Sequence, residues 1–396
     1  MKVNTQLFFD LSAAQPLDGG NHGGGEYAAS VFRRLVEMGN GPHLVLLVDE
    51  RRPVPDELRP YIVRSDAKVI EFTSKSDFQS ILHSNTAHHY FSAMPYHQHD
   101  LDFRGLDVVL SIHGLRAIEM PTDSLEIRYA GTAAAALKWL GKQSFTALYR
   151  AIHIKKISQL VSINANSLTI VVPSQHTKTI LVGSVPIPDS VSIKVLYSPT
   201  TAVASDNDYD AQYLTRVGLK EKRYFLIVSG KRWIKNALRA LYAVQDLTSE
   251  LEELQNIDVV VTGGSPKWLP KRILKRTKVL PFVKQSELRA LYTNAFALIY
   301  PSLNEGFGYP PLEAMTCGTP VISSDVCSIP EIAGDAPMYF SPYSQEELKA
   351  CIKELVMNEK KWEKHKNLGL IRSKNVRDKQ ENDLQELCRL IIPDSA

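Results

Sequence analysis

Residues 301–320 read PSLNEGFGYPPLEAMTCGTP, and this stretch decides how the second half of the chain folds. It follows the apolar run Ala297–Tyr300, which has the length and composition of a buried strand. Two glycines and two adjacent prolines then prevent one continuous helix from Glu305 to Glu313. Because proline is tolerated in the first helical turn, a short helix is expected to open at the prolines and end at Gly318, with Glu313 in its first turn. The stretch therefore predicts a strand, a glycine-containing loop and a helix.

Short apolar runs alternate with longer amphipathic segments along the whole chain, which predicts an α/β protein with parallel sheets and crossover helices. Strands are expected at residues 7–9, 43–48, 68–72, 108–112, 169–172, 192–196, 224–228, 259–262, 278–280, 297–300 and 320–323. Helices are expected between them, among others at residues 26–38, 236–248, 285–294 and 345–356.

A polar break at residues 198–209, SPTTAVASDNDY, separates two such patterns. A chain of 396 residues also exceeds a comfortable single core. We therefore predict two Rossmann-like, doubly wound domains, at residues 1–200 and 201–375. The helix expected at residues 376–396 should pack back on the first domain.

The composition is that of a globular protein, with 44% hydrophobic and 22% charged residues. A formal net charge of +3 is too small to indicate nucleic acid as a partner. Four cysteines without a C-x-x-C pair indicate a reducing compartment. The first residues do not form a secretory signal, and no apolar run reaches about 18 residues. A cytoplasmic enzyme is expected.

Glu305 and Glu313 are the main candidate site residues. Ligands of open α/β sheets bind beyond the carboxyl ends of strands, where both acids are expected. A carboxylate accepts hydrogen bonds from sugar hydroxyls, so an acid on the loop and one on the helix could hold two different diols. Alternatively, Glu313 complements the helix dipole while Glu305 is solvated, or the two act as the acid pair of a glycoside hydrolase.

The segment EGFGYPPLEAMTCGTPVI resembles the E-x7-E signature of retaining glycosyltransferases of family GT4, and the resemblance continues through SIPEIAGD at residues 328–335. It implies the GT-B fold, in which two Rossmann-like domains face each other. By position, Glu305 would contact the transferred sugar and Glu313 the nucleotide ribose. The resemblance implies further donor contacts from Gly306, Phe307, Gly308 and Tyr309.

A basic segment, SGKRWIKN at residues 229–236, follows the expected strand at 224–228. Arginine and lysine at the mouth of a parallel sheet can neutralise a diphosphate without a metal ion. Lys235 aligns with the lysine of the GT4 pattern, whereas either Lys231 or Arg232 could be its arginine; the chemistry favours Arg232. The alternative is a solvated basic turn. The resemblance adds donor contacts from Ser229, Gly230, Gly263, Phe282 and Val283.

In the first half, HGGGEY at residues 22–27 opens an expected helix, and Gly24 and Gly25 could bring backbone N–H groups against a donor. With Asp49, Gly23–Gly25 also fit a dinucleotide fingerprint, which would indicate a nicotinamide-dependent oxidoreductase. About a dozen residues separate the first strand from Gly23, whereas that fingerprint needs a tight turn. The GT4 interpretation is therefore preferred.

His113 ends an apolar strand and is a candidate catalytic residue that would contact the transferred sugar or the acceptor, although a lone histidine is more often structural. Histidines at 83, 88, 89, 97 and 99 lack the spacing of a zinc site, so no metal is expected.

Residues 133–157 combine apolar and basic side chains. They would form either an ordinary domain face or a peripheral contact with anionic lipid at the inner face of the membrane. Together with the basic segment at residues 229–236, the GT4 resemblance implies a retaining, metal-independent hexosyltransferase with a nucleoside-diphosphate sugar donor and a saccharide or lipid-linked acceptor, in bacterial surface polysaccharide synthesis. A non-catalytic sugar-nucleotide-binding protein is a further alternative.

Overall fold

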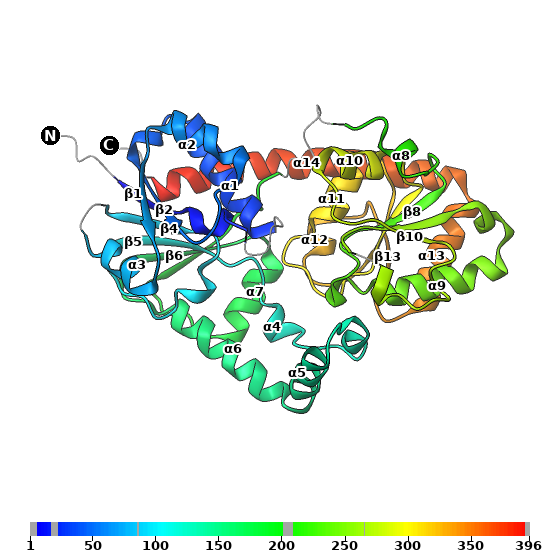
Figure 1. Ribbon diagram of the computed structural model, residues 1–396, viewed down its shortest axis with the longest axis horizontal. Helices are drawn as coiled ribbons and strands as arrows, with labels where there is room; N and C mark the ends of the chain where they lie inside the picture. The colour runs from blue at the N-terminus through cyan, green and yellow to red at the C-terminus, as the bar shows by residue number, and fades with distance from the viewer. Residues whose placement is uncertain (1–5, 17–22, 85–86, 201–208, 265, 393–396) are drawn as a thin grey trace. The chain divides into compact units, whose positions relative to one another are not determined.

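The computed structural model describes residues 6–16, 23–84, 87–200, 209–264 and 266–392. Contacts within the chain divide it into two compact units, each built on one parallel sheet (Figure 1). The first unit comprises Met1–Ile118, Ala151–Thr200 and Asp378–Ala396, and the second comprises Glu119–Arg150 and Thr201–Arg377. Residues 119–150 were expected in the first domain, but their contacts lie in the second unit.

The first unit has a seven-stranded sheet in the order β3-β2-β1-β4-β5-β6-β7. Successive residues of β1 face opposite sides: Leu7 and Phe9 join one buried cluster and Phe8 the other. The first cluster contains α1 and the end of α14, and the second contains side chains of α3, α6 and α7. Helices therefore cover both faces of the sheet. Its elements are β1 Leu7–Asp10, β2 Leu44–Asp49, β3 Lys68–Phe72, β4 His89–Ser92, β5 Phe103–Ser111, β6 Ala165–Val172, β7 Val191–Val195, α1 Gly23–Glu37, α2 Arg59–Ser65, α3 Lys75–Leu82, α4 Arg116–Glu119, α6 Thr146–Leu160 and α7 Gln175–Ser184.

The second unit has a six-stranded parallel sheet in the order β10-β9-β8-β11-β12-β13. Its central strands are fully buried, and α9 and α13 pack on one face through a shared apolar cluster. Its elements are β8 Tyr224–Ile227, β9 Asp258–Val261, β10 Thr277–Val279, β11 Ala297–Tyr300, β12 Val321–Ser324, β13 Met338–Phe340, α5 Ala133–Ser144, α8 Tyr213–Arg216, α9 Ala237–Glu250, α10 Gln285–Asn294, α11 Tyr309–Thr316, α12 Ile329–Ala333, α13 Gln345–Met357 and the part of α14 Glu359–Ile391 that precedes Asp378. The α/β fold class predicted from the sequence is confirmed.

Two strands were not expected from the sequence, β4 and β13. They contain four and three residues, as do several strands that were expected, so length alone does not explain why they were missed. β4 also lies in a histidine-rich stretch that reads as a loop.

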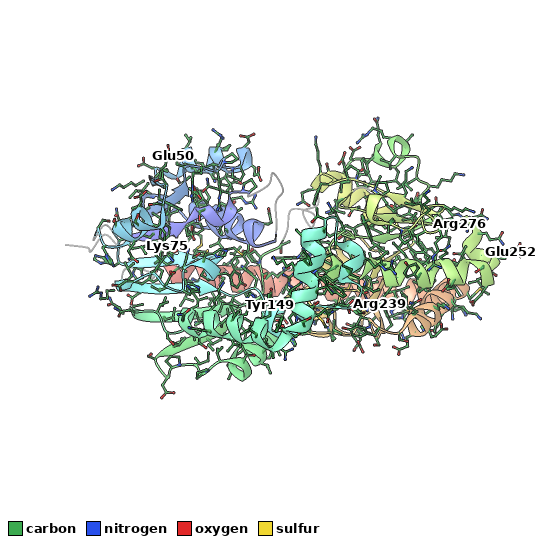
Figure 2. All side chains as sticks on the ribbon, turned by 60° about the horizontal axis from the view of Figure 1, so that its bottom comes forward. Glu50, Lys75, Tyr149, Arg239, Glu252 and Arg276 are labelled. Carbon is green, nitrogen blue, oxygen red and sulfur yellow. The ribbon has the colours of Figure 1, made fainter. Side chains whose placement is uncertain are left out.

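Specific contacts explain why residues 119–150 belong to the second unit. The Tyr129 ring stacks on Trp268 with ring centroids 5.1 Å apart, and the Tyr129 hydroxyl accepts a hydrogen bond of 3.0 Å from the backbone N–H of Leu238. Both carboxylate oxygens of Asp123 bind Arg239, a residue of α9 labelled in Figure 2, at 3.0 and 3.1 Å. The segment is therefore tied to α9 and the loop after β9.

The end of α14 packs on the first unit. Leu387 and Ile391 are buried beside α1, and Asp383 accepts a 2.7 Å hydrogen bond from the backbone N–H of Tyr197. Among the residues that the structure describes, no helix combines the length and apolar character that crossing a bilayer requires.

Candidate functional site

The candidate site of the second unit lies where the order of its sheet reverses. β8 is paired with β9 on one side and with β11 on the other, so chain order runs outward in both directions from this point. The loop at residues 229–236 leaves the carboxyl end of β8, and the loop at 301–308 leaves that of β11. In open α/β sheets a crevice between two such loops is where ligands bind.

An ion pair joins these two loops. The Lys235 ammonium lies 2.7 Å from Oε1 of Glu305, and it also donates to the Tyr300 hydroxyl at 2.8 Å. The Ser302 hydroxyl donates to the same Glu305 oxygen. The side chains of Lys235 and Glu305 are only 9% and 16% exposed, so the pair is largely shielded from water. Glu305 lies in the loop before α11, as predicted.

Electrostatics favour an ionised Glu305. Burial alone would raise the pKa of this carboxyl, but the charge of Lys235 and the hydrogen bonds from Lys235, Ser302 and Tyr300 outweigh it, and the pKa is lowered. Burial raises the pKa of the Tyr300 phenol, and the Glu305 charge raises it further. Glu305 is therefore a carboxylate whose hydrogen-bond donors are already in place.

Glu313 lies on α11 and is 8% exposed. The helix begins at Tyr309, after Gly308 at a φ of 99°, a conformation that glycine adopts without steric cost. Since the helix starts one residue before the prolines, Glu313 is its fifth residue, and the expectation that it lies in the first turn is wrong. Oε2 of Glu313 accepts a 2.9 Å hydrogen bond from the buried Tyr292 hydroxyl. A surface acid complementing the helix dipole would not be buried in this way.

The glycine loops pack against each other beside the ion pair. The backbone N–H of Gly230 donates to the Thr262 carbonyl at 3.0 Å, and that of Gly263 donates to Leu280 at 3.1 Å. A Cβ on Gly230 would lie 2.3 Å from the Val261 side chain, so this approach requires glycine. The loops after β8, β9 and β10 thus meet at one edge of the sheet.

The remaining candidates of the second unit lie in the same loops. Lys231 and Arg232 are both exposed. Burial lowers the pKa of Lys235 against the opposing charge of Glu305, and the positive charge of Arg232 lowers it further. Phe282 is 81% exposed after β10, with Val283 half-buried beside it. The rings of Phe307 and Tyr309 contact each other edge to face, 5.1 Å apart.

Sequence reasoning missed Tyr300, Ser302 and Tyr292, which hold the two acids. Tyr300 and Ser302 lie at the carboxyl end of β11, and this position could have identified them as candidates from the sequence. Tyr292 reaches Glu313 from α10, and its hydrogen bond spans 21 residues of sequence. No local pattern indicates that contact.

The first unit contains the other candidates. Gly24 and Gly25 lie in the first turn of α1. Nε2 of His113 hydrogen-bonds to the Ala93 carbonyl at 2.7 Å, so this ring nitrogen has a structural role. The Asp49 carboxylate is bound by Arg51 at 2.8 Å and by Arg52 at 3.2 Å, so it is not presented as an acceptor for a ribose. This pairing weakens the oxidoreductase interpretation.

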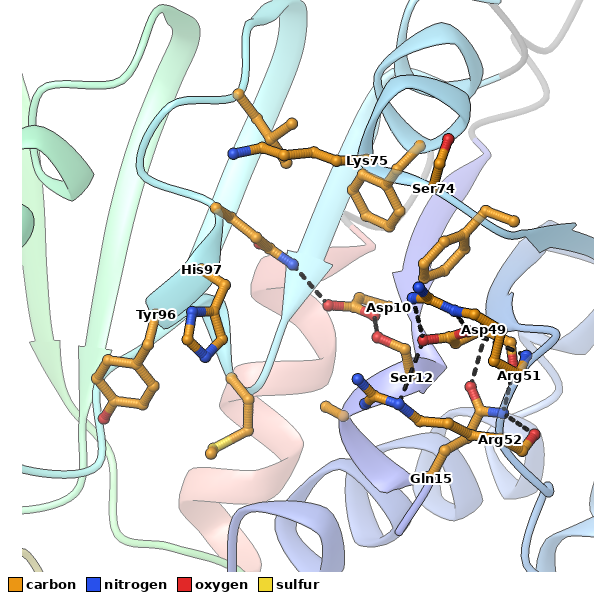
Figure 3. A pocket seen from close by; sticks show the side chains of 16 residues that line it. Asp10, Ser12, Gln15, Asp49, Arg51, Arg52, Ser74, Lys75, Tyr96 and His97 are labelled. Carbon is orange, nitrogen blue, oxygen red and sulfur yellow. Dashed lines mark hydrogen bonds and ion pairs between the residues drawn. The ribbon is translucent and has the colours of Figure 1, made fainter. Parts of the chain in front are cut away.

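The sheet of the first unit also has a reversal point, between β1 and β4. A cavity of about 400 Å³ opens there, at the carboxyl ends of the strands (Figure 3). Asp10 lies in it fully buried and accepts hydrogen bonds of 2.8 Å from both Ser92 and Gln98. Burial raises the pKa of Asp10. Arg51 and Lys75 line the same cavity, so it combines an acid, an amide and cations over an apolar wall.

The region that contains the Lys235–Glu305 ion pair matches a known protein family. Residues 214–370 match the family described as "Glycosyl transferases group 1". The O-antigen chain mannosyltransferase RfbU of Salmonella typhimurium is 27% identical over 174 residues, which is 42% of this chain and 45% of that protein. O-antigen chain mannosyltransferase B of Escherichia coli is 44% identical over 75 residues, 19% of this chain and 20% of that protein. The matches thus span less than half the length of these curated relatives.

Structural comparison extends over nearly the whole chain. Anabaena HepE, solved in complex with UDP-glucose, superimposes with a TM-score of 0.66 at 13% identity, covering 97% of this chain and 99% of that one. Identity this low identifies the fold alone.

Proposed function

We propose that this chain, a member of the group 1 glycosyl transferases with the GT-B fold, transfers a hexose from a nucleoside-diphosphate sugar to a saccharide or lipid-linked saccharide. The observation that carries the proposal is the buried Lys235–Glu305 pair at the reversal point of the second sheet, beside the exposed Arg232. A carboxylate can accept hydrogen bonds from sugar hydroxyls and the neighbouring cations suit a diphosphate, which supports the proposal.

In this proposal each acid holds a different part of the donor. Glu305 binds hydroxyls of the transferred sugar, and Glu313 binds those of the ribose. Arg232 and Lys235 bind the diphosphate, and the glycine loops at residues 229–230 and 263 line the nucleotide with main chain. We also propose that Gly24 and Gly25 contact the donor and that His113 contacts the transferred sugar or the acceptor.

The proposed reaction retains the anomeric configuration. The acceptor hydroxyl attacks C1 from the face that the diphosphate leaves, the C1–O bond to phosphate breaks, and the hydroxyl proton passes to a phosphate oxygen. Glu305 transfers no proton in this proposal, because a carboxyl with a lowered pKa is a poor acid and it already accepts hydrogen bonds from its partners, and Glu313 holds the ribose instead. Arg232 and Lys235 stabilise the charge that develops on the leaving diphosphate, so no metal ion is required.

The acceptor is assigned to the first unit. The cavity around Asp10 offers a buried carboxylate, an amide and the rim cations, a combination suited to a polyol. The names of the matched relatives make O-antigen-like surface polysaccharide the first acceptor class to test and a mannosyl nucleotide the first donor.

We also propose a cytoplasmic, peripheral position at the inner face of the membrane. Leu137, Leu140, Phe145 and Leu148, which we call the α5–α6 surface, are between 50% and 68% exposed. The inner side of α5 is anchored, since Trp139 donates to the Asp123 carbonyl at 3.0 Å and Lys142 pairs with Glu126. Residues 127–188 contain no acid, and Tyr149 marks this part of α6 in Figure 2. An apolar surface with basic neighbours fits an anionic bilayer.

The donor proposal is tested by thermal shift against a panel of sugar nucleotides, NAD and free nucleotides, with and without EDTA. Stabilisation by one sugar nucleotide that survives EDTA is the expected result. The Glu305→Ala variant should then lose sugar transfer while still binding the nucleotide. Stabilisation by NAD alone, or transfer that EDTA abolishes, would contradict the proposal, and donor binding without transfer to any acceptor pool would indicate a sensor.

Flotation with phosphatidylcholine vesicles, with and without phosphatidylglycerol, tests the membrane proposal. Leu137→Ser/Leu148→Ser should lose binding to the anionic vesicles. The matched control Val63→Ser/Ile371→Ser removes two exposed apolar side chains elsewhere and should bind like the wild type. Equal binding by both variants would refute the assignment.

A further inference from the structure

The first unit contains a second cavity, of about 290 Å³, that the proposed donor and acceptor sites do not use. It lies between the 3-10 helix Pro95–His97, α4 and α6. Its floor is apolar, since Leu115, Ile157 and Leu160 belong to the buried core. This volume is at the lower end of those found for small-molecule sites, so it fits one group of a ligand rather than a whole nucleotide.

The wall of this cavity is basic. Arg116 and Lys156 line it together with His97 and His153, and none of its lining residues is acidic. His153 and Lys156 are three residues apart on α6 and therefore share one face of the helix. α6 itself carries no aspartate or glutamate. The lining thus has a formal charge of +2 even with both histidines neutral.

The effect of these charges is visible on His153. Its pKa is lowered, first by burial and then by the positive charges of Lys156 and Arg116. Tyr96 and His97 line the cavity from the opposite element. The basic groups therefore act on one small concave space, and a concave site lined by charges of one sign concentrates the opposite ion.

We propose that this cavity binds a phosphate group, as a monoester or diester, and that the acceptor carries it. The Arg116 guanidinium supplies paired N–H donors for phosphate oxygens, Lys156 supplies a point charge, and His153 adds a ring donor. The assignment to the acceptor rests on the function proposed above, whereas the phosphate site itself does not.

Titration of the full chain with inorganic phosphate, at ionic strength held constant with sodium chloride, tests the site. Calorimetry should show saturable binding, and the His153 resonance should shift because a bound anion raises the pKa of that imidazole. Lys156→Gln should weaken phosphate binding about tenfold or more, since hydrogen bonds to charged groups are of that strength. The matched control is Lys155→Gln, which removes an exposed neighbouring charge that does not line the cavity.

The source of the phosphate is distinguished by two further titrants, a hexose 1-phosphate and short-chain dihexanoyl phosphatidylglycerol below its micelle concentration. Tighter binding of the first supports a soluble sugar phosphate, and tighter binding of the second supports a lipid phosphodiester. Equal losses for Lys155→Gln and Lys156→Gln, or non-saturable binding with no change at His153, would overturn the proposal. None of these measurements needs turnover, so a failure of sugar transfer would leave this result interpretable.

Discussion

The Lys235–Glu305 pair gives the most direct test of the site geometry. Replacing Lys235 by methionine keeps the length of the side chain but leaves the Glu305 carboxylate with only its hydroxyl donors, Ser302 and Tyr300. Breaking a buried ion pair costs about 3–5 kcal/mol. Because Glu305 remains 16% exposed and water can partly replace the ammonium, we expect a loss of about 2–4 kcal/mol in the free energy of unfolding.

Tryptophan fluorescence reports this change cleanly. All four tryptophans of the chain, at 139, 233, 268 and 362, lie in the second unit, so their signal follows the unit that contains the pair. With a urea dependence of about 2 kcal/mol per molar, the unfolding midpoint should fall by roughly 1–2 M. Lys231→Met, in the same loop but exposed, is the matched control and should change the midpoint little.

The double variant Lys235→Met/Glu305→Gln separates a true pair from two independent losses. Removing both charges leaves no uncompensated ion, so the double variant should be more stable than Lys235→Met alone. If the effects of the two single variants simply add, or if Lys235→Met costs less than about 1 kcal/mol, the pair is not formed as described.

Three further outcomes follow from the same loops. Because the pKa of Glu305 is lowered in the folded state, the ionised carboxylate stabilises the fold fully above pH 4.5, and this stabilisation is lost as the pH falls through the folded-state pKa. In urea melts at a series of pH values, the difference in unfolding free energy between wild type and Glu305→Gln should therefore disappear in acid. Arg232→Gln should weaken nucleoside diphosphate binding about tenfold by calorimetry and Lys231→Gln far less; the reverse order would assign the phosphate contact to Lys231. Gly230→Ala should cost about 1–3 kcal/mol through its clash with Val261, and Val261→Ala should restore much of that loss in the same melts; no rescue would mean that the clash is not the cause.

Much of the architecture could be predicted from the local sequence. Proline restricts the backbone and glycine permits conformations that other residues avoid, so the loop after β11 and the helix following it could be predicted from residues 301–320 alone. Buried parallel strands are typically continuous apolar runs, and such runs located eleven of the thirteen strands in the part of the chain that the structure describes. β4 and β13 were missed although strands of the same length, such as β10 and β11, were predicted; β4 lies in a histidine-rich stretch.

Contacts between distant residues could not be read in this way. The Lys235–Glu305 hydrogen bond joins residues 70 apart, whereas the sequence analysis assigned the two residues to different parts of one donor and predicted no contact between them. The attachment of residues 119–150 to the second unit depends on Tyr129 meeting Trp268, again without a local signal. The turn occupied by Glu313 was wrong by one residue at the helix start, since Gly308 in a left-handed conformation caps the helix earlier than the prolines suggest.

The ion pair also constrains how a donor would bind. A diphosphate that approaches Arg232 and Lys235 meets the negative charge of Glu305, which already shares the Lys235 ammonium. Hydrogen bonds from sugar hydroxyls to the carboxylate offset that repulsion. Glu305 should therefore weaken the binding of a free nucleoside diphosphate but not that of the complete donor. Glu305→Gln should therefore bind the free nucleoside diphosphate as tightly as the wild type or more tightly, while binding the sugar nucleotide less tightly. Calorimetry on both ligands measures the two affinities, and equal weakening of both would show that Glu305 holds the nucleotide rather than the sugar.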